Sequence, residues 1–329
     1  MDRITNQYRI IAAGAGWIDR SRRGRLKFEG KDARAFLQAL VTNDLDAIAP
    51  GSGIDAAYLT PQGRMIAMLR ILVSASDLLV DVAPGQAADL ATRFDRLIFT
   101  EQVTVTDVTE ATTAICVVGG DAAGVVARVV GLDRAPIAAL ASLGHLASGD
   151  TQVVRVDDAP LPGYVIWAPV ATRQTLIDRL VDAGAVEIDP TLDQALRIEA
   201  GRPEFGVDMT DDTIPLEAGL LERAISTTKG CYVGQEVIIR VLHRGAGRVA
   251  KRLVRLTFES DVTSPPQAGT PLVADDKETG RITSAAWLPG RDRVIALGYV
   301  HRDAATAGAR VLARTADGDL AAEITGFAG

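Results

Sequence analysis

The chain has 329 residues and a formal net charge of -7, from 35 basic and 42 acidic side chains. This length predicts two or three domains rather than one core, and the acidic balance argues against nucleic-acid binding over the whole surface. The two cysteines, Cys116 and Cys231, exclude a disulfide framework and cannot supply the four thiolates that usually hold an iron–sulfur cluster.

The N-terminal residues 1–17 lack the basic head and apolar run of a signal peptide. No stretch approaches the roughly 20 apolar residues of a membrane span. We therefore expect a cytoplasmic protein in a reducing compartment, with no membrane partner. We assign no metal-binding residues.

Apolar spacing predicts the elements in chain order. Helices are expected over residues 31–41, 86–99, 122–130, 171–183 and 191–200. Strands are expected over residues 54–59, 64–74, 78–82, 102–108, 112–118, 151–156, 164–168, 253–258, 281–287 and 294–300. Helices and strands mix without regular alternation as far as Arg248, which predicts an α+β fold rather than a doubly wound sheet.

After Arg248 the helical periodicity ends, and short strand-like runs are separated by turns rich in Pro and Gly. This pattern of short strands and turns predicts a small all-β domain, a barrel. We therefore expect two interleaved α+β domains within residues 1–245, with the boundary between them undefined, and a C-terminal β-barrel over residues 246–329.

The stretch KGCYVGQEVIIR, from Lys229 to Arg240, concentrates unusual features. It predicts that Cys231 lies on a glycine-flanked loop that leads into a helix of roughly ten residues. A thiol between a lysine and a helix N-terminus is in a setting that lowers its pKa and makes it reactive. A small core cysteine beside an ordinary Lys-Gly turn is the alternative. Cys116, in the apolar run AICVV, is expected to be buried and inert.

The segment Lys-Gly-Cys-Tyr-x-Gly-Gln-Glu resembles the signature of the YgfZ-type folate-binding proteins, relatives of the glycine cleavage T-protein that include proteins of iron–sulfur cluster assembly. The match continues through four further residues, Arg240, His243, Arg244 and Gly245. Residues 36–45, 58–65, 197–208 and 214–218 also fit the superfamily. The resemblance implies two α+β domains and a barrel, arranged as a three-domain ring around a folate channel.

The resemblance also implies site residues. Cys231 and Lys229 are assigned a catalytic role. Tetrahydrofolate or a one-carbon derivative is the implied cofactor, and its expected contacts are Glu199, Asn43, Tyr58, Tyr232, Gln235, Glu236 and Arg240. A carboxylate such as Glu199 can accept two hydrogen bonds from the amino-pyrimidine edge of a pterin. Ordinary structural roles remain open: Glu199 can pair with Arg197 or Arg202, Asn43 can cap a turn, and Asp208 and Glu217 can be caps or ion pairs.

The basic run Arg240, His243, Arg244, Arg248, Lys251, Arg252 and Arg255 has three interpretations: a site for the glutamate tail of folate, a nucleic-acid surface, or a solvated strand face. A second feature is an absence. The resemblance to the aminomethyltransferase branch implies an acidic pair at positions where this chain has Ala67 and Met68. Neither side chain can transfer a proton or stabilise a developing cation, which argues against aminomethyl transfer.

The resemblance implies a tetrahydrofolate-binding protein that supports assembly or repair of iron–sulfur enzymes, with client enzymes or assembly proteins as partners. A folate-dependent aminomethyltransferase or demethylase is the first alternative, and a factor related to tRNA modification is the second. Whether any reaction is catalysed stays open.

Overall fold

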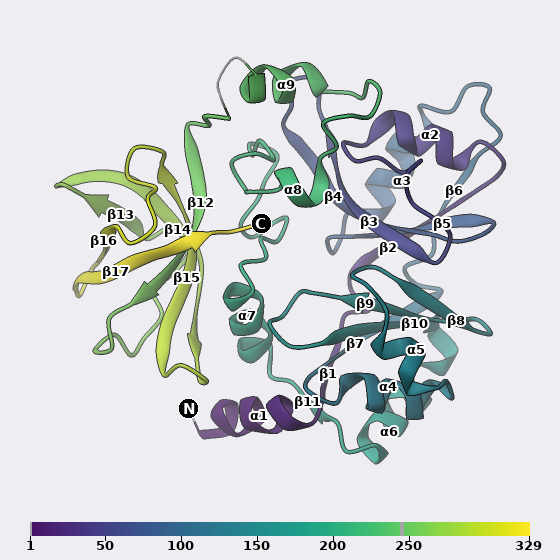
Figure 1. Cartoon of the computed structure of the whole chain (residues 1–329), viewed down its shortest axis with the longest axis horizontal. Coiled ribbons are helices and arrows are strands. Elements are labelled where there is room, and N and C mark those ends of the chain that lie inside the picture. The colour runs from purple at the N-terminus through teal and green to yellow at the C-terminus, as the bar shows by residue number, and fades with distance from the viewer. Residues whose placement is uncertain (1, 244–246) are drawn as a thin grey trace.

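The computed structural model describes residues 2–243 and 247–329. The expected domain boundary between residues 245 and 246, and the motif residues Arg244 and Gly245, lie outside the described residues. Two units of mixed helix and sheet lie beside a C-terminal barrel (Figure 1). This architecture confirms the predicted α+β class with a terminal β-barrel. Among the described helices, none is long and apolar enough to cross a membrane.

The first unit is an antiparallel sheet in the order β3-β4-β5-β2-β6. Its strands are β2 (Gly24–Glu29), β3 (Ser52–Leu59), β4 (Met65–Val73), β5 (Asp77–Val82) and β6 (Thr104–Asp107). Helices α2 (Ala33–Leu40) and α3 (Ala87–Asp95) contribute side chains to the same core as the sheet. Phe94 of α3 packs edge-on against Phe28, with 5.3 Å between ring centroids. Alternation along β4 turns every second side chain toward this core and leaves the others on the opposite face.

The second unit is a six-stranded sheet in the order β11-β1-β7-β10-β9-β8. Its strands are β1 (Gly16–Asp19), β7 (Thr112–Val118), β8 (His145–Ser148), β9 (Thr151–Val156), β10 (Gly163–Pro169) and β11 (Val186–Glu187). Its helices are α4 (Ala122–Val130), α5 (Arg134–Ala138), the 3-10 turn η1 (Val170–Thr172) and α6 (Arg173–Asp182). The core between sheet and helices is almost entirely aliphatic. Near-continuous burial of β7 and β10 explains why both read as unbroken apolar runs.

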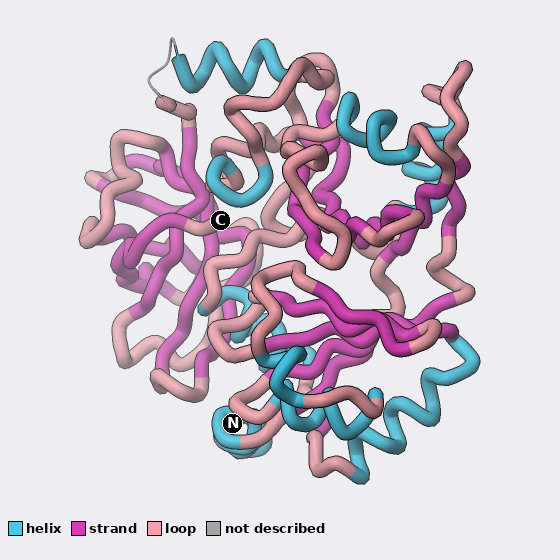
Figure 2. Tube along the Cα trace, turned by 45° about the vertical axis from the view of Figure 1, so that its right-hand side comes forward, coloured by secondary structure: helices cyan, strands magenta, loops and turns pink. Residues whose placement is uncertain are grey.

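The chain passes between these two sheets more than once. Helix α1 (Asp2–Ala13) and β1 lie with the second sheet, the chain then builds the whole first sheet, and it returns to the second sheet at β7. Figure 2 shows the two sheets as neighbours, with the first sheet above the second in this view. Side chains from β1, β4 and the β9–β10 connection therefore face one another although they lie far apart in sequence.

A largely irregular segment joins the second sheet to the barrel and carries α7 (Pro190–Glu199), α8 (Leu221–Ala224) and α9 (Gln235–His243). Helix α7 begins with standard capping: Asp189 accepts a 2.9 Å hydrogen bond from the Thr191 amide, and Pro190 occupies the first turn. Gly201 follows its C-terminus with φ +70°, a left-handed conformation that favours glycine.

The barrel closes in the order β12-β15-β14-β13-β16-β17. Its strands are β12 (Lys251–Phe258), β13 (Pro271–Ala274), β14 (Lys277–Leu288), β15 (Arg293–His301), β16 (Arg310–Thr315) and β17 (Gly318–Phe327). One set of side chains fills its interior. A second set on β14 and β15 packs outward against Ala195 and Ile198 of α7. Strand β15 is buried on both faces for this reason.

One predicted helix ends earlier in the structure, and α1 is among the elements that were not predicted. The helix expected over residues 86–99 ends at Asp95. Beyond it Ile98 still packs against the core of the first unit, whereas Phe99 is 83% exposed. Helix α1 was not predicted. Its Ile11 is fully buried in a small cluster formed with Leu192 and Leu196 of α7, a partner that is remote in sequence.

Candidate functional site

A cavity of about 470 Å³ lies where the two sheets meet the segment that contains α7 and α8. Its lining comes from β1 and the turn after it, from β3 and β4, from the residues after β5, from Asp158 in the β9–β10 connection, and from residues 190–223. No described residue of the barrel belongs to this lining. We call this space the central cavity.

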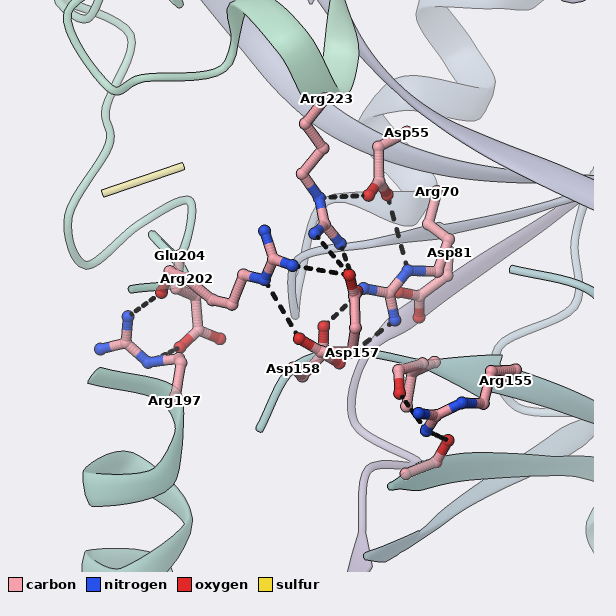
Figure 3. A network of polar contacts seen from close by, with 12 residues as sticks. Asp55, Arg70, Asp81, Arg155, Asp157, Asp158, Arg197, Arg202, Glu204 and Arg223 are labelled. Atoms are coloured by element: carbon pink, nitrogen blue, oxygen red, sulfur yellow. Dashed lines mark hydrogen bonds and ion pairs between the residues drawn. The ribbon is translucent and has the colours of Figure 1, made fainter. Parts of the chain in front are cut away.

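Alternating arginines and carboxylates form one wall of the central cavity (Figure 3). Asp158 lies between Arg70, at 2.7 Å, and Arg20, at 3.1 Å. Asp55 contacts Arg223 at 2.5 Å, and its other oxygen lies 3.6 Å from Arg70. Arg20, Arg70 and Asp158 come from three different segments, so folding alone brings these charges together.

The buried ion pairs hold Asp158 in its charged form. Burial by itself would raise the pKa of Asp158, but the guanidinium groups of Arg70 and Arg20 outweigh it and hold the pKa well below its usual range. Asp158 is therefore a fixed charge of the wall rather than a group that exchanges protons near neutral pH.

The lining as a whole favours an anion with an apolar body. Its seven arginines are Arg20, Arg22, Arg23, Arg70, Arg197, Arg202 and Arg223, and its five carboxylates are Asp19, Asp55, Asp158, Asp193 and Glu204. The lining is thus two charges positive in a protein whose net charge is -7. Arg22 is exposed and forms no ion pair with any described residue. Apolar surface comes from Ile18, Met68, Phe205, Val207 and Leu220.

Asp208 connects the cavity wall to the barrel. Its side chain is fully buried and accepts hydrogen bonds from Thr283, at 2.5 Å, and Ser284, at 2.7 Å, both on β14. Arg197, which lines the cavity, donates to the same carboxylate at 2.5 Å. The barrel therefore fixes the position of Arg197 although it contributes no described lining residue.

The two positions that replace the acidic pair face opposite sides of β4. Ala67 is fully buried in the core of the first unit. Met68 faces the central cavity, on the same face as Arg70. Of these two positions, only position 68 could therefore present an acid to a ligand in this cavity, and there the chain carries a thioether.

Asn43 and Tyr58 lie outside the cavity lining. The Asn43 amide donates to the carbonyls of Asp55, at 2.8 Å, and Arg223, at 3.2 Å. Tyr58 packs in the core of the first unit, 5.0 Å from the ring of Phe94. The structure gives Asn43 a bridging position beside the cavity wall and gives Tyr58 a core position.

Glu199 also lies outside the central cavity. It ends α7 on the side that faces the barrel, and its Oε1 accepts a hydrogen bond from Nε of Arg291 at 3.2 Å. The partner expected for it among the structural alternatives was Arg197 or Arg202. Arg197 instead pairs with Asp208 and Glu204, and Arg202 pairs with Asp157.

Lys229 is buried and serves as an anchor for the motif. Its ammonium donates hydrogen bonds to three carbonyl oxygens at the end of α2. Gln38, at 2.6 Å, lies in the last turn of the helix, and Val41 and Asn43, at 2.7 and 3.0 Å, follow it. Burial lowers the pKa of Lys229 to about 8, so the group remains mainly protonated at neutral pH. All three ammonium protons are thereby engaged by backbone.

The rest of the motif forms a surface loop and helix. Cys231 is exposed, while Tyr232 is buried, and burial raises the pKa of its phenol to about 12. Gln235 and Glu236 begin α9, and Arg240 lies exposed near its end. None of these five residues lines the central cavity. The motif and the cavity are therefore two separate candidate sites.

Close contact with a neighbouring backbone explains why the residue after Cys231-Tyr232-Val233, Gly234, is a glycine. A side chain at Gly234 would lie 2.5 Å from the carbonyl oxygen of Thr60 in the β3–β4 turn, and its φ is +83°. Gly63 in that turn similarly leaves room for Val237 of α9. The loop that carries Cys231 therefore packs directly against the β3–β4 turn of the first unit, and this contact fixes the position of Cys231.

Most of the cavity wall was not predicted from sequence. Glu204 and Arg202 fall inside the recognised segment of residues 197–208. Arg20, Arg70 and Asp158 stand in separate segments with no shared pattern, and their common property is visible only after folding. The basic run assigned after Arg240 contributes no described residue to this wall.

The fold consists of two mixed α/β units and a C-terminal barrel, with an arginine-lined cavity where the two sheets meet. The chain belongs to the glycine cleavage T-protein family: residues 1–229 match the GCVT N-terminal domain, and residues 251–327 match the glycine cleavage T-protein C-terminal barrel domain. This membership supports tetrahydrofolate or a one-carbon derivative as the cofactor, as the sequence motifs predicted.

Individual relatives agree with this assignment. The chain is 28% identical to an aminomethyltransferase of Rubrobacter xylanophilus, covering 90% of this chain and 79% of that protein. It is 25% identical to a putative chloroplastic transferase of Arabidopsis thaliana, covering 88% of this chain and 66% of that protein. Its fold is similar to that of the glycine cleavage system aminomethyltransferase T from Bartonella henselae, with a TM-score of 0.88, 21% identity, and coverage of 98% and 88% of the two chains.

Proposed function

We propose that this protein binds a reduced folate in the central cavity and supports the assembly or repair of iron–sulfur enzymes, without transferring an aminomethyl group. The observation that carries the proposal is Met68, which presents a thioether to the cavity at the position where an acid would serve transfer chemistry. The exposed Cys231 on its separate loop provides the group through which client enzymes or assembly proteins would be served.

The cavity suits a folate in size and charge. A volume of about 470 Å³ is within the range of ligand pockets. Folate carries two carboxylates on its glutamate tail, and the lining is two charges positive. Arg22 and Arg23, on the turn after β1, are placed to hold that tail by charge-assisted hydrogen bonds. Glu204 offers a carboxylate to an amino-pyrimidine edge, and Phe205 and Met68 offer apolar contact for a ring. A bound folate would supply one-carbon chemistry to this site.

Calorimetry with tetrahydrofolate tests the binding proposal. We expect measurable binding at micromolar to millimolar ligand, weakened by about 1 kcal/mol in Arg22→Ala because one charge-assisted contact is lost. Arg9→Ala, an exposed arginine on α1 away from the cavity lining, is the matched control and should bind as the unmodified chain does. Absence of heat at millimolar tetrahydrofolate would overturn the proposal.

An aminomethyltransferase, which the names of the relatives favour, or a folate-dependent demethylase is the second candidate. Incubation with a lipoyl carrier protein, an aminomethyl donor and tetrahydrofolate separates the two. We expect no turnover above background, because Met68 cannot exchange a proton. Turnover of about one per minute or faster, a low rate for an enzyme, would favour the transferase.

The iron–sulfur role is tested by complementation of a strain that lacks its own YgfZ-type protein. The unmodified chain should restore iron–sulfur enzyme activity, and Cys231→Ser should not. Restoration of tRNA modification without any change in iron–sulfur enzyme activity would favour the tRNA-related alternative instead. Direct RNA binding by the purified chain is not expected, given its net charge of -7.

A further inference from the structure

A second hollow, separate from the central cavity, lies between the C-terminal end of α7 and the outside of the barrel. Its volume is about 220 Å³. Its apolar lining is Ile198, Leu256, Leu288, Ile295 and Ala296. Its polar lining is Glu199, Arg255, Arg291, Thr257 and Thr325. Two guanidinium groups and one carboxylate leave this lining one charge positive.

Arg255 lies at an irregular point of the barrel that accommodates its side chain. The pairing of β12 with β17 shifts register between Arg255 and Leu256, a bulge of the kind that redirects side chains. A side chain at Gly326 would approach Nη2 of Arg255 to 2.9 Å, and one at Gly201 would approach its Cδ to 3.0 Å, so both glycines leave room for the Arg255 side chain. Its Nε is buried, and no described residue accepts a hydrogen bond from it.

Glu199 presents the complementary group. Its side chain is 12% exposed; Oε1 accepts a hydrogen bond from Arg291, whereas the buried Oε2 has no hydrogen-bond partner among the described residues. Buried polar atoms are normally satisfied, so an unpaired donor and an unpaired acceptor beside one hollow indicate that a further group completes them. The Arg291 side chain is 66% exposed, so its rotation can uncover the carboxylate without disturbing the barrel.

We propose that this hollow binds a small aliphatic carboxylic acid with a hydrogen-bond donor on its α-carbon, that is, an α-amino or α-hydroxy acid. The ligand carboxylate pairs with Arg255, the α-substituent donates to Glu199, and the aliphatic body contacts the apolar lining. A hollow of this size excludes a folate and restricts the ligand to a few carbon atoms. The proposal is independent of folate binding in the central cavity.

Calorimetry on the full chain with three probes of matched shape tests the ligand class. The probes are L-leucine, L-2-hydroxy-4-methylpentanoate, and 4-methylpentanoate, which lacks the α-substituent. We expect one of the first two to bind at least about tenfold more tightly than the third, because the third leaves Glu199 unpaired. The tighter of the two identifies the amino or the hydroxy acid as the source. Equal binding of all three, or no heat from any at millimolar concentration, would overturn the proposal.

Variants test the location. Arg255→Met should weaken binding of the preferred probe by at least about tenfold, because the carboxylate loses its partner. Arg252→Met changes an exposed arginine on the same strand outside the hollow, and should bind normally. Thr257→Leu narrows the hollow and keeps all three of its charges. If Arg255→Met lowers the melting temperature of the protein, Thr257→Leu tests the location of the probe in its place. Unchanged binding in both Arg255→Met and Thr257→Leu would place the probe elsewhere and sink the assignment.

Discussion

The ammonium nitrogen of Lys229 lies 2.6 Å from the carbonyl oxygen of Gln38, a contact that spans 191 positions of the chain. Two more carbonyls, of Val41 and Asn43, complete its hydrogen bonds. The sequence favoured Lys229 as a group that activates the Cys231 thiol. That role stays a prediction. The contacts support a positioning role, because an ammonium engaged by three backbone oxygens fixes the loop that carries Cys231.

Removal of the Lys229 ammonium should therefore destabilise the protein. We expect Lys229→Met to lower the free energy of unfolding by about 1–3 kcal/mol, because three buried carbonyls lose a charged donor. Urea unfolding measures this, with the exposed Lys31→Met as the control. A loss no larger than about 0.5 kcal/mol, the range of ordinary surface substitutions, would contradict the anchoring role.

The two thiols should differ strongly in reactivity. Cys231 is exposed, whereas Cys116 is buried in β7, and burial raises the pKa of the Cys116 thiol to about 11. A maleimide probe at neutral pH should therefore label Cys231 first, because access and thiolate content both disfavour Cys116. Peptide mass mapping over time measures the order. Cys231→Ser should keep the melting temperature of the unmodified chain, and faster labelling of Cys116 would show that the exposed loop does not govern reactivity.

A carboxylate introduced at position 67 of β4 should lower the free energy of unfolding more than one introduced at position 68. Ala67→Asp places a charge in a fully buried aliphatic core and should destabilise the fold by several kcal/mol, or prevent folding. Met68→Asp places the charge beside Arg70 in the central cavity and should cost less than about 1.5 kcal/mol. Thermal or urea unfolding of the two variants measures the difference. Similar losses would mean that position 68 does not face the cavity.

Acid should weaken the cavity wall through Asp158. Its pKa is held below the usual range in the folded state, so its contribution is complete above the unfolded value of about 4 and is lost as the pH falls through the lower folded value. We expect the free energy of unfolding to fall between about pH 5 and pH 2, and to fall less steeply in Asp158→Asn. Glu259→Gln, an exposed carboxylate on the barrel, serves as control. Parallel pH profiles for Asp158→Asn and the unmodified chain would contradict the coupling.

The sequence by itself determined the class of fold and the character of its elements. Periodicity located β7 and α4 with the bounds seen in the structure, because their apolar patterns depend on local packing against one sheet or helix layer. The change of texture after Arg248 identified the barrel, since short strands and turns are encoded locally. The motif around Cys231 predicted a loop that leads into a helix, and α9 begins at Gln235.

Tertiary structure alone decided which residues share a site. Arg20, Arg70 and Asp158 meet because the chain crosses between two sheets, and no local pattern encodes a contact between such distant segments. Strand pleat decided that Met68, and not Ala67, faces the cavity, since neighbouring residues on a strand point to opposite faces. Contacts with the end of α2 made Lys229 an anchor. On α7, Glu199 and Arg197 project from different sides of the helix, so Glu199 points toward the barrel and Arg197 toward the cavity. These assignments depend on the directions of side chains in the folded chain, which the order of residues does not specify by itself.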